Sequence, residues 1–234
     1  MMNAPIALAI DAPDLATAIA WAKIVDGQIS TLKVGLETFL RDGIDGIHAI
    51  RSAAPSCKLF LDLKLHDIPN TVAGACRSIS ALNPEYLTVH ALGGSEMILR
   101  AVETLPSTKI TAVTVLTSMT QEDLDRLELG AIENLAAALA GVAVAAGAEA
   151  LVCSPLEVKE IRAQVGPKIT LITPGVRLNE GNMGDQHRVA TPKQALAEGA
   201  DLLVIGRPIT DAWQSGGAAG LASALGNVLD HLRS

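Results

Sequence analysis

The sequence has few aromatic residues: two Trp, one Tyr and two Phe make up 2% of its 234 residues. A core of this size therefore has to be built from Ala, Val, Ile and Leu, and the hydrophobic fraction of 49% is large enough to supply it. Such cores are typical of helices packed on a buried parallel sheet, whose strands read as short apolar runs.

The sequence also lacks a basic tract and has a net charge of −7. A surface with this charge repels polyanions, and no aromatic residues are interspersed with basic ones, so no nucleic-acid binding is expected. A small anionic ligand is still compatible with this composition wherever a few cations converge.

Cysteines are scarce, and so are long apolar runs. Cys57, Cys76 and Cys153 form no C-x-x-C pair, which indicates reduced thiols in a cytoplasmic protein. No basic segment precedes the first apolar run, so no signal peptide is predicted. Residues 135–148 come closest to a membrane span, but they are too few and include two glycines, so no membrane association is expected.

What the sequence does contain is a regular alternation of apolar runs and segments with helical spacing. The predicted strands are 6–11, 31–36, 58–65, 86–92, 109–116, 149–154, 169–173 and 201–206. The predicted helices are 15–24, 38–53, one that begins near Pro69, a turn at 122–127, 131–146, 156–165, one that begins at Pro192, and 218–232. Eight such strand–helix units of about thirty residues match the usual length of a βα unit.

This alternation implies parallel strands joined by right-handed crossovers. We therefore expect an α/β fold, a closed (β/α)8 TIM barrel, with residues 1–234 forming a single domain. A doubly wound open sheet is the second interpretation. Because no G-x-G-x-x-G follows the first predicted strand, a dinucleotide-binding fold has little support.

Residues 60–71, with the sequence FLDLKLHDIPNT, carry an unusual charge pattern. Alternate residues of a strand share a face, so Asp62 and Lys64 point one way while the leucines between them point toward the helices. Asp67 adds a second carboxylate just past the strand end. The simplest structural interpretation is an ion pair that ties the strand end to its loop.

Polar residues gather at the C-terminal ends of the predicted strands, which is the rim where a barrel of this kind builds its active site. These residues are Asp11, Lys33, Asp62, Lys64, His90, Thr117, Ser118, Arg177 and Arg207. Strand alternation directs the first four toward the barrel axis. Because three strands deliver charges of alternating sign to one place, we favour a functional site over a purely structural network.

Lys64 is the residue on which the predicted chemistry depends. Between Asp62 and Asp67 it should stay protonated, because the two carboxylates favour its charged form more than nearby Lys33 disfavours it. Lys64 is then a proton donor and not a Schiff-base nucleophile, which would need a depressed pKa.

Gly206 and Arg207 follow the last predicted strand, where barrels often bind phosphate. Arg207 offers a charged fork for a phosphate, although an isolated Arg at a strand end would usually be a surface residue. Gln186 lies in the glycine-containing loop 178–190, which we expect to fold over the same phosphate as a lid.

Potential metal ligands surround Lys64 in the sequence and on the next predicted strand. Asp62, His66, Asp67 and His90 include the oxygen and nitrogen ligands that metals use in proteins. Lys64 in their midst would repel a cation, so no metal is predicted.

The segment after the third predicted strand resembles the signature of the orotidine 5'-phosphate decarboxylase family, prokaryotic type. The signature consists of Asp62, Leu63, Lys64, Leu65, His66, Asp67, Ile68, Pro69, Asn70 and Thr71. Further similar segments, in the same order as in the family, are LAID at 8–11, LKVG at 32–35, VTVLTSM at 113–119, TPGVR at 173–177, GDQ at 184–186 and IGRPIT at 205–210. Within them, Val176 stands where the family commonly has Ile.

The resemblance implies a homodimer that converts orotidine 5'-phosphate to UMP and CO2 without a metal or organic cofactor. It implies that Lys64 protonates C6 of the pyrimidine while Asp62 lies against the substrate carboxylate. Asp67, together with Ile68 and Thr71, would reach into the site of the partner subunit, and the whole signature would form part of the substrate site.

The remaining roles also follow from the resemblance. Asp11 and Lys33 would hold the ribose hydroxyls, with Lys33 joining Asp62, Lys64 and Asp67 in the catalytic network. Thr117 and Ser118 would contact the pyrimidine; the phosphate would be bound by Arg177, Gln186, Gly206 and Arg207.

Two other functions fit parts of the pattern. Mg²⁺-dependent sugar-phosphate decarboxylases and aldol synthases of related barrels share D-x-K-x-x-D, although residues 117–118 and 174–177 fit the pyrimidine enzyme better. A non-catalytic phosphate-binding barrel is the third interpretation, and it leaves the charged residues without a role.

Overall fold

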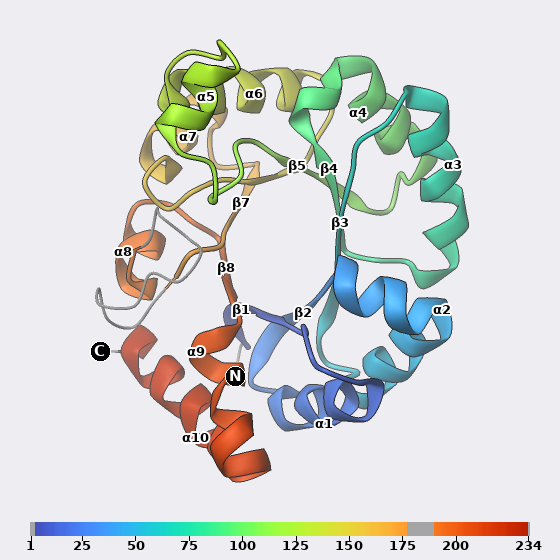
Figure 1. The fold of residues 1–234 in the computed structure, drawn as a ribbon, viewed down its shortest axis with the longest axis vertical. Coiled ribbons are helices and arrows are strands. Elements are labelled where there is room, and N and C mark those ends of the chain that lie inside the picture. The colour runs from blue at the N-terminus through green and yellow to red at the C-terminus, as the bar shows by residue number, and fades with distance from the viewer. Residues whose placement is uncertain (1–2, 177–189, 234) are drawn as a thin grey trace.

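The computed structural model describes residues 3–176 and 190–233, and within these residues eight parallel strands close into a barrel in the order β1 to β8 (Figure 1). Each strand pairs with its successor in the chain, and β1 pairs with β8. The helices form a ring around the strands (Figure 1). The predicted (β/α)8 barrel is therefore confirmed, and the open sheet is excluded.

The elements have the following bounds. The strands are β1 (Ala4–Ala9), β2 (Ile29–Gly35), β3 (Lys58–Leu65), β4 (Tyr86–His90), β5 (Lys109–Val113), β6 (Ala150–Val152), β7 (Thr170–Thr173) and β8 (Leu202–Ile205). The α-helices are α1 (Leu15–Val25), α2 (Leu36–Ala53), α3 (Pro69–Ile79), α4 (Gly94–Thr104), α5 (Gln121–Arg126), α6 (Ile132–Ala145), α7 (Val158–Val165), α8 (Pro192–Ala197), α9 (Arg207–Thr210) and α10 (Ala212–Arg233). Two 3₁₀ turns, η1 (Ser80–Leu82) and η2 (Ala91–Gly93), flank β4.

Several boundaries differ from the prediction. The fifth strand was predicted to run to residue 116 but ends at Val113, because Val113 pairs with Val152, the last residue of the short β6. The final helix begins at Ala212 and not near 218, and its two parts meet at a backbone break at Gly217, whose φ is 52°. Helices α4 and α9 were not predicted.

Helix starts, in contrast, carry recognisable local signals. The Asp14 carboxylate accepts a hydrogen bond of 2.7 Å from the Thr17 N–H at the start of α1. Pro69 occupies the first turn of α3, where its missing N–H costs nothing. Thr191 and Gln194 bond reciprocally as a capping box at the start of α8.

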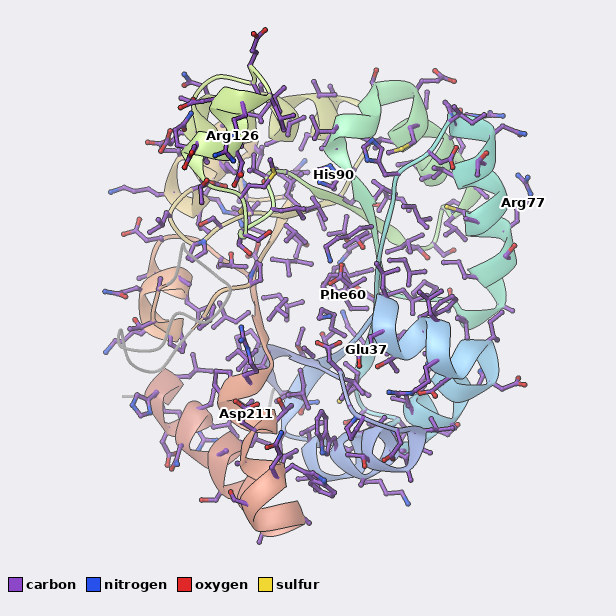
Figure 2. All side chains as sticks on the ribbon, in the orientation of Figure 1. Glu37, Phe60, Arg77, His90, Arg126 and Asp211 are labelled. Carbon is purple, nitrogen blue, oxygen red and sulfur yellow. The ribbon has the colours of Figure 1, made fainter. Side chains whose placement is uncertain are left out.

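The apolar core has two parts, one on each side of the strands. The larger part lies between the strands and the helices, and it contains leucines such as Leu61 and Leu63. The smaller part fills the barrel interior and consists of Ala7, Phe60, Tyr86, Ala150, Ile172 and Leu202. The rings of Phe60 and Tyr86 pack edge to face, with centroids 5.6 Å apart, and Phe60 points into the barrel (Figure 2).

Trp21 and Trp213, predicted to be packing residues, contact each other between α1 and α10 with ring centroids 6.2 Å apart. Among residues 3–176 and 190–233, no helix combines the length and apolar character needed to cross a membrane.

Candidate active site

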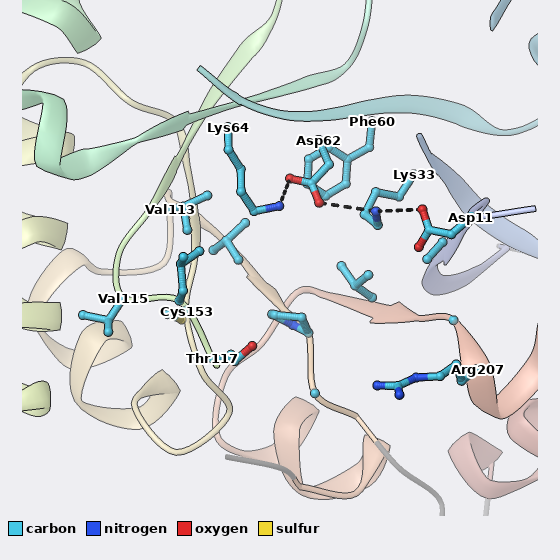
Figure 3. Close-up of a pocket in the computed structure, with 17 residues that line it drawn as sticks. Asp11, Lys33, Phe60, Asp62, Lys64, Val113, Val115, Thr117, Cys153 and Arg207 are labelled. Carbon is cyan, nitrogen blue, oxygen red and sulfur yellow. Dashed lines mark hydrogen bonds and ion pairs between the residues drawn. The ribbon is translucent and has the colours of Figure 1, made fainter. Parts of the chain in front are cut away.

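A cavity of about 490 Å³ lies in the barrel at the C-terminal ends of the strands (Figure 3). Its lining comes from several strands and from the segments that follow them. The lining residues are Ala9, Asp11, Lys33, Phe60, Asp62, Lys64, Val113, Val115, Leu116, Thr117, Val152, Cys153, Pro174, Gly175, Val204, Gly206 and Arg207. The cavity therefore occupies the rim on which the sequence predicted an active site.

Four charged side chains of alternating sign form a row across one wall of this cavity (Figure 3). Lys64 Nζ lies 2.8 Å from Asp62 Oδ1, and Lys33 Nζ lies 3.3 Å from Asp62 Oδ2. Lys33 Nζ also lies 4.0 Å from Asp11 Oδ1, which extends the row onto the segment after β1. Strand alternation predicted this convergence. Asp11 follows β1, Lys33 lies in β2, and Asp62 and Lys64 share a face of β3.

Asp62 is the centre of the row and its side chain is only 14% exposed. Burial acts to raise the pKa of this carboxyl, but the charges of Lys33 and Lys64 and hydrogen bonds from Lys64 and Thr88 outweigh it. The pKa of Asp62 consequently lies below its ordinary value, and Asp62 is an anion held between two ammonium groups.

Lys64 has an unusual backbone as well as a charged partner. Its φ of 47° lies in the left-handed region that residues other than glycine rarely adopt. The pairing of β3 with β4 is irregular between Leu61 and Leu65, which places Lys64 inside a bulge. Bulges and unusual backbone conformations are concentrated at active sites, where they direct a side chain.

No ion pair joins Asp67 to Lys64 within this chain, where the carboxylate partner of Lys64 is Asp62, and the expected place of Asp67 in the site of a partner subunit stays a prediction. Asp67 is exposed, and its Oδ1 accepts a hydrogen bond of 2.7 Å from the Ile68 N–H. The chain turns away from the cavity after β3 to begin α3 at Pro69. This turn leaves the Asp67 carboxylate on the surface of the chain.

The ten residues of the signature lie in three different surroundings: the cavity, the core and the surface. Only Asp62 and Lys64 of the signature line the cavity of their own chain. Leu63 is buried in the core between strands and helices, and Leu65 packs against that core. Beyond the strand, His66, Ile68 and Asn70 are exposed, Pro69 is half-buried and Thr71 is exposed.

His66 and His90 form a stacked pair beside Lys64, with ring centroids 5.3 Å apart and an angle of 18° between the rings. His90 Nδ1 accepts a hydrogen bond from the Leu92 N–H. Burial lowers the pKa of His90, and the charges of His66 and Lys64 lower it further. Both effects favour the neutral form of the His90 ring, which lies next to the ammonium of Lys64.

Arg207 lies at the end of the cavity remote from Lys64 (Figure 3). Gly206 precedes it, and a Cβ added to Gly206 would come within 3.2 Å of Ala9 Cβ, so a larger residue would crowd this end of the cavity. Thr117 also lines the cavity, whereas Ser118 is exposed. The other two predicted phosphate residues, Arg177 and Gln186, lie outside the described residues.

Some cavity residues were missed by the sequence reasoning. Val113, Val115 and Cys153 form an apolar wall, and Phe60 closes the cavity toward the barrel interior. Their position at strand ends could have identified them, because apolar residues of the inner face line a barrel site just as charged ones do. Thr88 was missed too, and its hydroxyl donates a 3.0 Å hydrogen bond to Asp62 Oδ1.

Within the described part of the chain, no group of three or more His, Cys, Asp or Glu side chains is arranged to hold a metal ion. The independence of the reaction from metal stays a prediction. Among the described lining residues, the charges of Asp11, Lys33, Asp62 and Lys64 cancel, and Arg207 leaves the lining with a net positive charge that favours an anionic ligand.

Comparison with known proteins agrees with this geometry. The family model described as "Orotidine 5'-phosphate decarboxylase / HUMPS family" matches residues 4–220. A protein named orotidine 5'-phosphate decarboxylase from Thermobifida fusca is 57% identical over 224 residues, covering 95% of this chain and 96% of its own length. Another of that name, from Frankia casuarinae, is 47% identical over 93% of this chain and 85% of its own length.

A solved structure has the same fold. The crystal structure of orotidine 5'-phosphate decarboxylase from Lactobacillus acidophilus superposes with a TM-score of 0.81 at 33% sequence identity. The match covers 99% of this chain and 100% of that chain. With the family model, the sequence relatives and the barrel geometry in agreement, this chain belongs to the orotidine 5'-phosphate decarboxylase / HUMPS family.

Proposed function

We propose that the protein is a lyase that decarboxylates orotidine 5'-phosphate to UMP and CO2, a step of pyrimidine biosynthesis. The observation that carries the proposal is the row of alternating charges inside the rim cavity, with Lys64 2.8 Å from Asp62 and Lys33 3.3 Å from it. The names of the relatives that cover nearly all of the chain support the same substrate. We further propose that residues 1–234 act as one cytoplasmic domain.

The chemistry follows from the charge that develops when CO2 leaves. The bonding electrons stay on C6 of the pyrimidine, and the fixed ammonium of Lys64 stabilises that negative charge as it forms. Lys64 then delivers a proton to C6, which completes UMP. Because Asp62 and the bulge hold Lys64 in place before the substrate arrives, little reorganisation is needed during the reaction.

Asp62 has a second role in this proposal. Its carboxylate lies in the same cavity as Lys64, so the substrate carboxylate would bind beside an anion and be relieved of that repulsion when CO2 departs. The charge of Lys33 favours the ionised form of Asp62, and Lys33 and Asp11 are proposed to bind the ribose hydroxyls.

The phosphate would bind at the opposite end of the cavity. Arg207 can offer a charge-assisted pair of hydrogen bonds there, and Gly206 lets the ligand approach the backbone. Arg177 and Gln186 are proposed to bind the same phosphate, and Thr117 and Ser118 to contact the pyrimidine. The energy of phosphate binding can secure the alignment of the remote reacting carbon.

We also propose a homodimer in which Asp67, Ile68 and Thr71 complete the site of a second copy. The supporting observation is that the segment around Asp67 faces away from its own cavity and exposes Ile68 by 66%. Leu40 on α2 and Leu92 in η2 are also exposed, by 78% and 44%, on the units that flank β3 in the barrel. We propose that a second copy buries these three apolar side chains.

The test is the fall in ultraviolet absorbance when purified protein is mixed with orotidine 5'-phosphate, with and without EDTA. We expect turnover that EDTA does not reduce. A Mg²⁺-dependent sugar-phosphate enzyme of the same family would leave orotidine 5'-phosphate unchanged, and a non-catalytic barrel would bind it without turnover. Sedimentation of the same sample tests the dimer, and a monomer at full activity would contradict the shared site.

A further inference from the structure

Thr88, in the middle of β4, lies opposite the irregular stretch of β3. Thr88 is fully buried. The β3–β4 pairing is regular up to Leu61 and resumes at Leu65, so residues 62–64 face a single residue of β4, Thr88. The regular hydrogen bonds between neighbouring strands cannot form across such a bulge. The backbone N–H and C=O groups of the bulge therefore need other partners.

The hydroxyl of Thr88 bonds to one backbone group of the bulge and to one of its side chains. The Lys64 N–H donates to Thr88 Oγ1 at 2.8 Å, and Thr88 Oγ1 lies 3.0 Å from Asp62 Oδ1. A backbone N–H can only donate, so the hydroxyl accepts from Lys64 and its own hydrogen is left for the carboxylate. One buried hydroxyl therefore links the backbone of the lysine to the side chain of the aspartate.

Both linked groups depend on such an anchor. Lys64 has a φ of 47°, a conformation that a long side chain seldom adopts unless its surroundings impose it. Asp62 Oδ1 receives Lys64 Nζ and Thr88, while Oδ2 faces Lys33 at 3.3 Å. Rotation of the carboxylate would exchange these partners, and the hydrogen bond from Thr88 opposes that rotation.

We infer that Thr88 is a positioning residue for the decarboxylation, which acts on the reaction through Asp62 and Lys64 and not by contact with the substrate. The inference rests on the proposed function and extends it to a residue on a different strand. A reacting group displaced by about 1 Å loses about 10²-fold in rate, so loss of the anchor should be visible in kcat.

The experiment compares Thr88→Val, Thr88→Ala and Thr88→Ser. Thr88→Val keeps the side-chain shape and removes the hydroxyl, while the Ala and Ser variants differ from each other only in the hydroxyl. We expect Val and Ala to lower kcat about 10- to 100-fold with little change in KM, and Ser to restore most of kcat.

A matched control is available on the neighbouring strand. Thr111 of β5 pairs with Thr88 and is also fully buried, but its hydroxyl bonds to the Lys109 carbonyl at 3.0 Å. Thr111→Val removes an equally buried hydroxyl with no link to Asp62. Its kcat should stay at the wild-type value.

The pH profile separates positioning from a general loss of stability. A hydrogen bond to the ionised carboxylate lowers its pKa, so removing the Thr88 hydroxyl should raise the pKa of Asp62. The other charged groups around Asp62 are Lys33 and Lys64, with Asp11 beyond Lys33, and none of them is changed. The acid limb of kcat should move to higher pH in the Val and Ala variants but not in Thr88→Ser.

Each outcome decides the inference. If the wild-type protein does not decarboxylate orotidine 5'-phosphate, the proposed function and this inference fail together. If the wild type is active and the Val and Ala variants match its kcat and its acid limb, only the inference about Thr88 is overturned. If circular dichroism shows that Thr88→Val does not fold, the comparison of Ala with Ser decides in the same way.

Discussion

The two ends of the barrel each carry a carboxylate between two lysines, and the two triplets differ in the burial of the carboxylate, in its geometry and in what surrounds it. At the C-terminal end, Asp62 lies between Lys33 and Lys64. At the N-terminal end, Glu85 Oε1 accepts from Lys58 at 3.0 Å and from Lys109 at 3.1 Å. The same combination of one carboxylate and two ammonium groups therefore occurs at both ends of the barrel.

The triplet around Glu85 is a solvated network that ties strand starts together. The side chains of Lys58 and Lys109 are 54% and 36% exposed, and both lysines share one oxygen of Glu85. Burial raises the pKa of Glu85, but the hydrogen bonds and charges of the two lysines lower it overall. Exposed pairs of this kind contribute at most about 1 kcal/mol to stability.

The triplet around Asp62 lies on the wall of a cavity and includes a residue with a strained backbone; the Asp62 side chain is 14% exposed and that of Lys64 is 35% exposed. Each Asp62 oxygen has its own lysine, and the Lys33 side chain is only 9% exposed. Removing charged side chains such as Asp62 and Lys33 from water costs free energy, and such groups are concentrated at functional sites. The difference shows that charge pattern alone does not identify a site, whereas charge, burial and cavity together do.

The largest expected effect comes from removing one lysine at each end. Lys64→Ala should lower kcat by about 10⁴-fold or more while orotidine 5'-phosphate still binds, because it removes both the proton donor and the stabilising charge. Lys58→Ala should leave kcat unchanged. Turnover measured by ultraviolet absorbance and binding measured by calorimetry check both. Near-normal turnover in Lys64→Ala would disprove its role.

The next effect comes from neutralising the two carboxylates. Asp62→Asn should lower kcat about 10²-fold or more, because the ammonium of Lys64 loses its charged anchor. Glu85→Gln should leave kcat unchanged and cost about 1 kcal/mol or less in unfolding free energy. Steady-state kinetics and urea unfolding measure the two quantities. Equal losses of kcat in both variants would remove the distinction between the two ends.

Arg207→Ala tests the far end of the cavity. We expect kcat/KM for orotidine 5'-phosphate to fall about 10- to 100-fold, because a charged hydrogen-bond pair with the phosphate is lost. Orotidine without the phosphate should react equally slowly with both proteins. An unchanged kcat/KM for the phosphorylated substrate would refute the phosphate assignment.

The smallest effect is on stability against acid. The pKa values of Asp62 and Glu85 are lowered in the folded state from 3.8 and 4.5, so the folded protein binds these protons more weakly than the unfolded chain. Each group stabilises the fold above its unfolded pKa, and this stability is lost as the pH falls toward the folded pKa. Salt screens exposed charges more than buried ones.

Acid unfolding followed by circular dichroism at low and high salt measures this difference. Asp62→Asn should make the loss of stability below about pH 4 less steep at both salt concentrations, whereas Glu85→Gln should do so mainly at low salt. An effect of Asp62→Asn that disappears in high salt would mean that this carboxylate is as solvated as Glu85.

Much of the fold and part of the site follow from the sequence. The apolar runs predicted eight strands in order, and β3 has the bounds predicted for it, because the leucines of its outer face alternate with the residues of its inner face. Strand alternation also brought Asp11, Lys33 and Asp62 to one wall. These successes depend on local periodicity, which the sequence records directly.

The rest depends on relations between strands. The contact between Thr88 and Asp62 requires the bulge in β3, and nothing in the periodicity of residues 58–65 signals one. The surroundings of Asp67 also depend on more than its place in the sequence, because its carboxylate bonds to the Ile68 N–H just before α3 begins and makes no ion pair with Lys64 of the same chain. Short α9 was missed because a helix of this length has no period to detect.

The central claim is that the ammonium of Lys64 stabilises negative charge at C6 and exchanges a proton with it. The direct measurement is proton NMR of UMP in D2O with catalytic amounts of protein, following replacement of the C6 hydrogen by deuterium. We expect the wild type and Lys58→Ala to catalyse this exchange and Lys64→Ala to leave the C6 hydrogen in place. Exchange by Lys64→Ala at the wild-type rate would contradict the account.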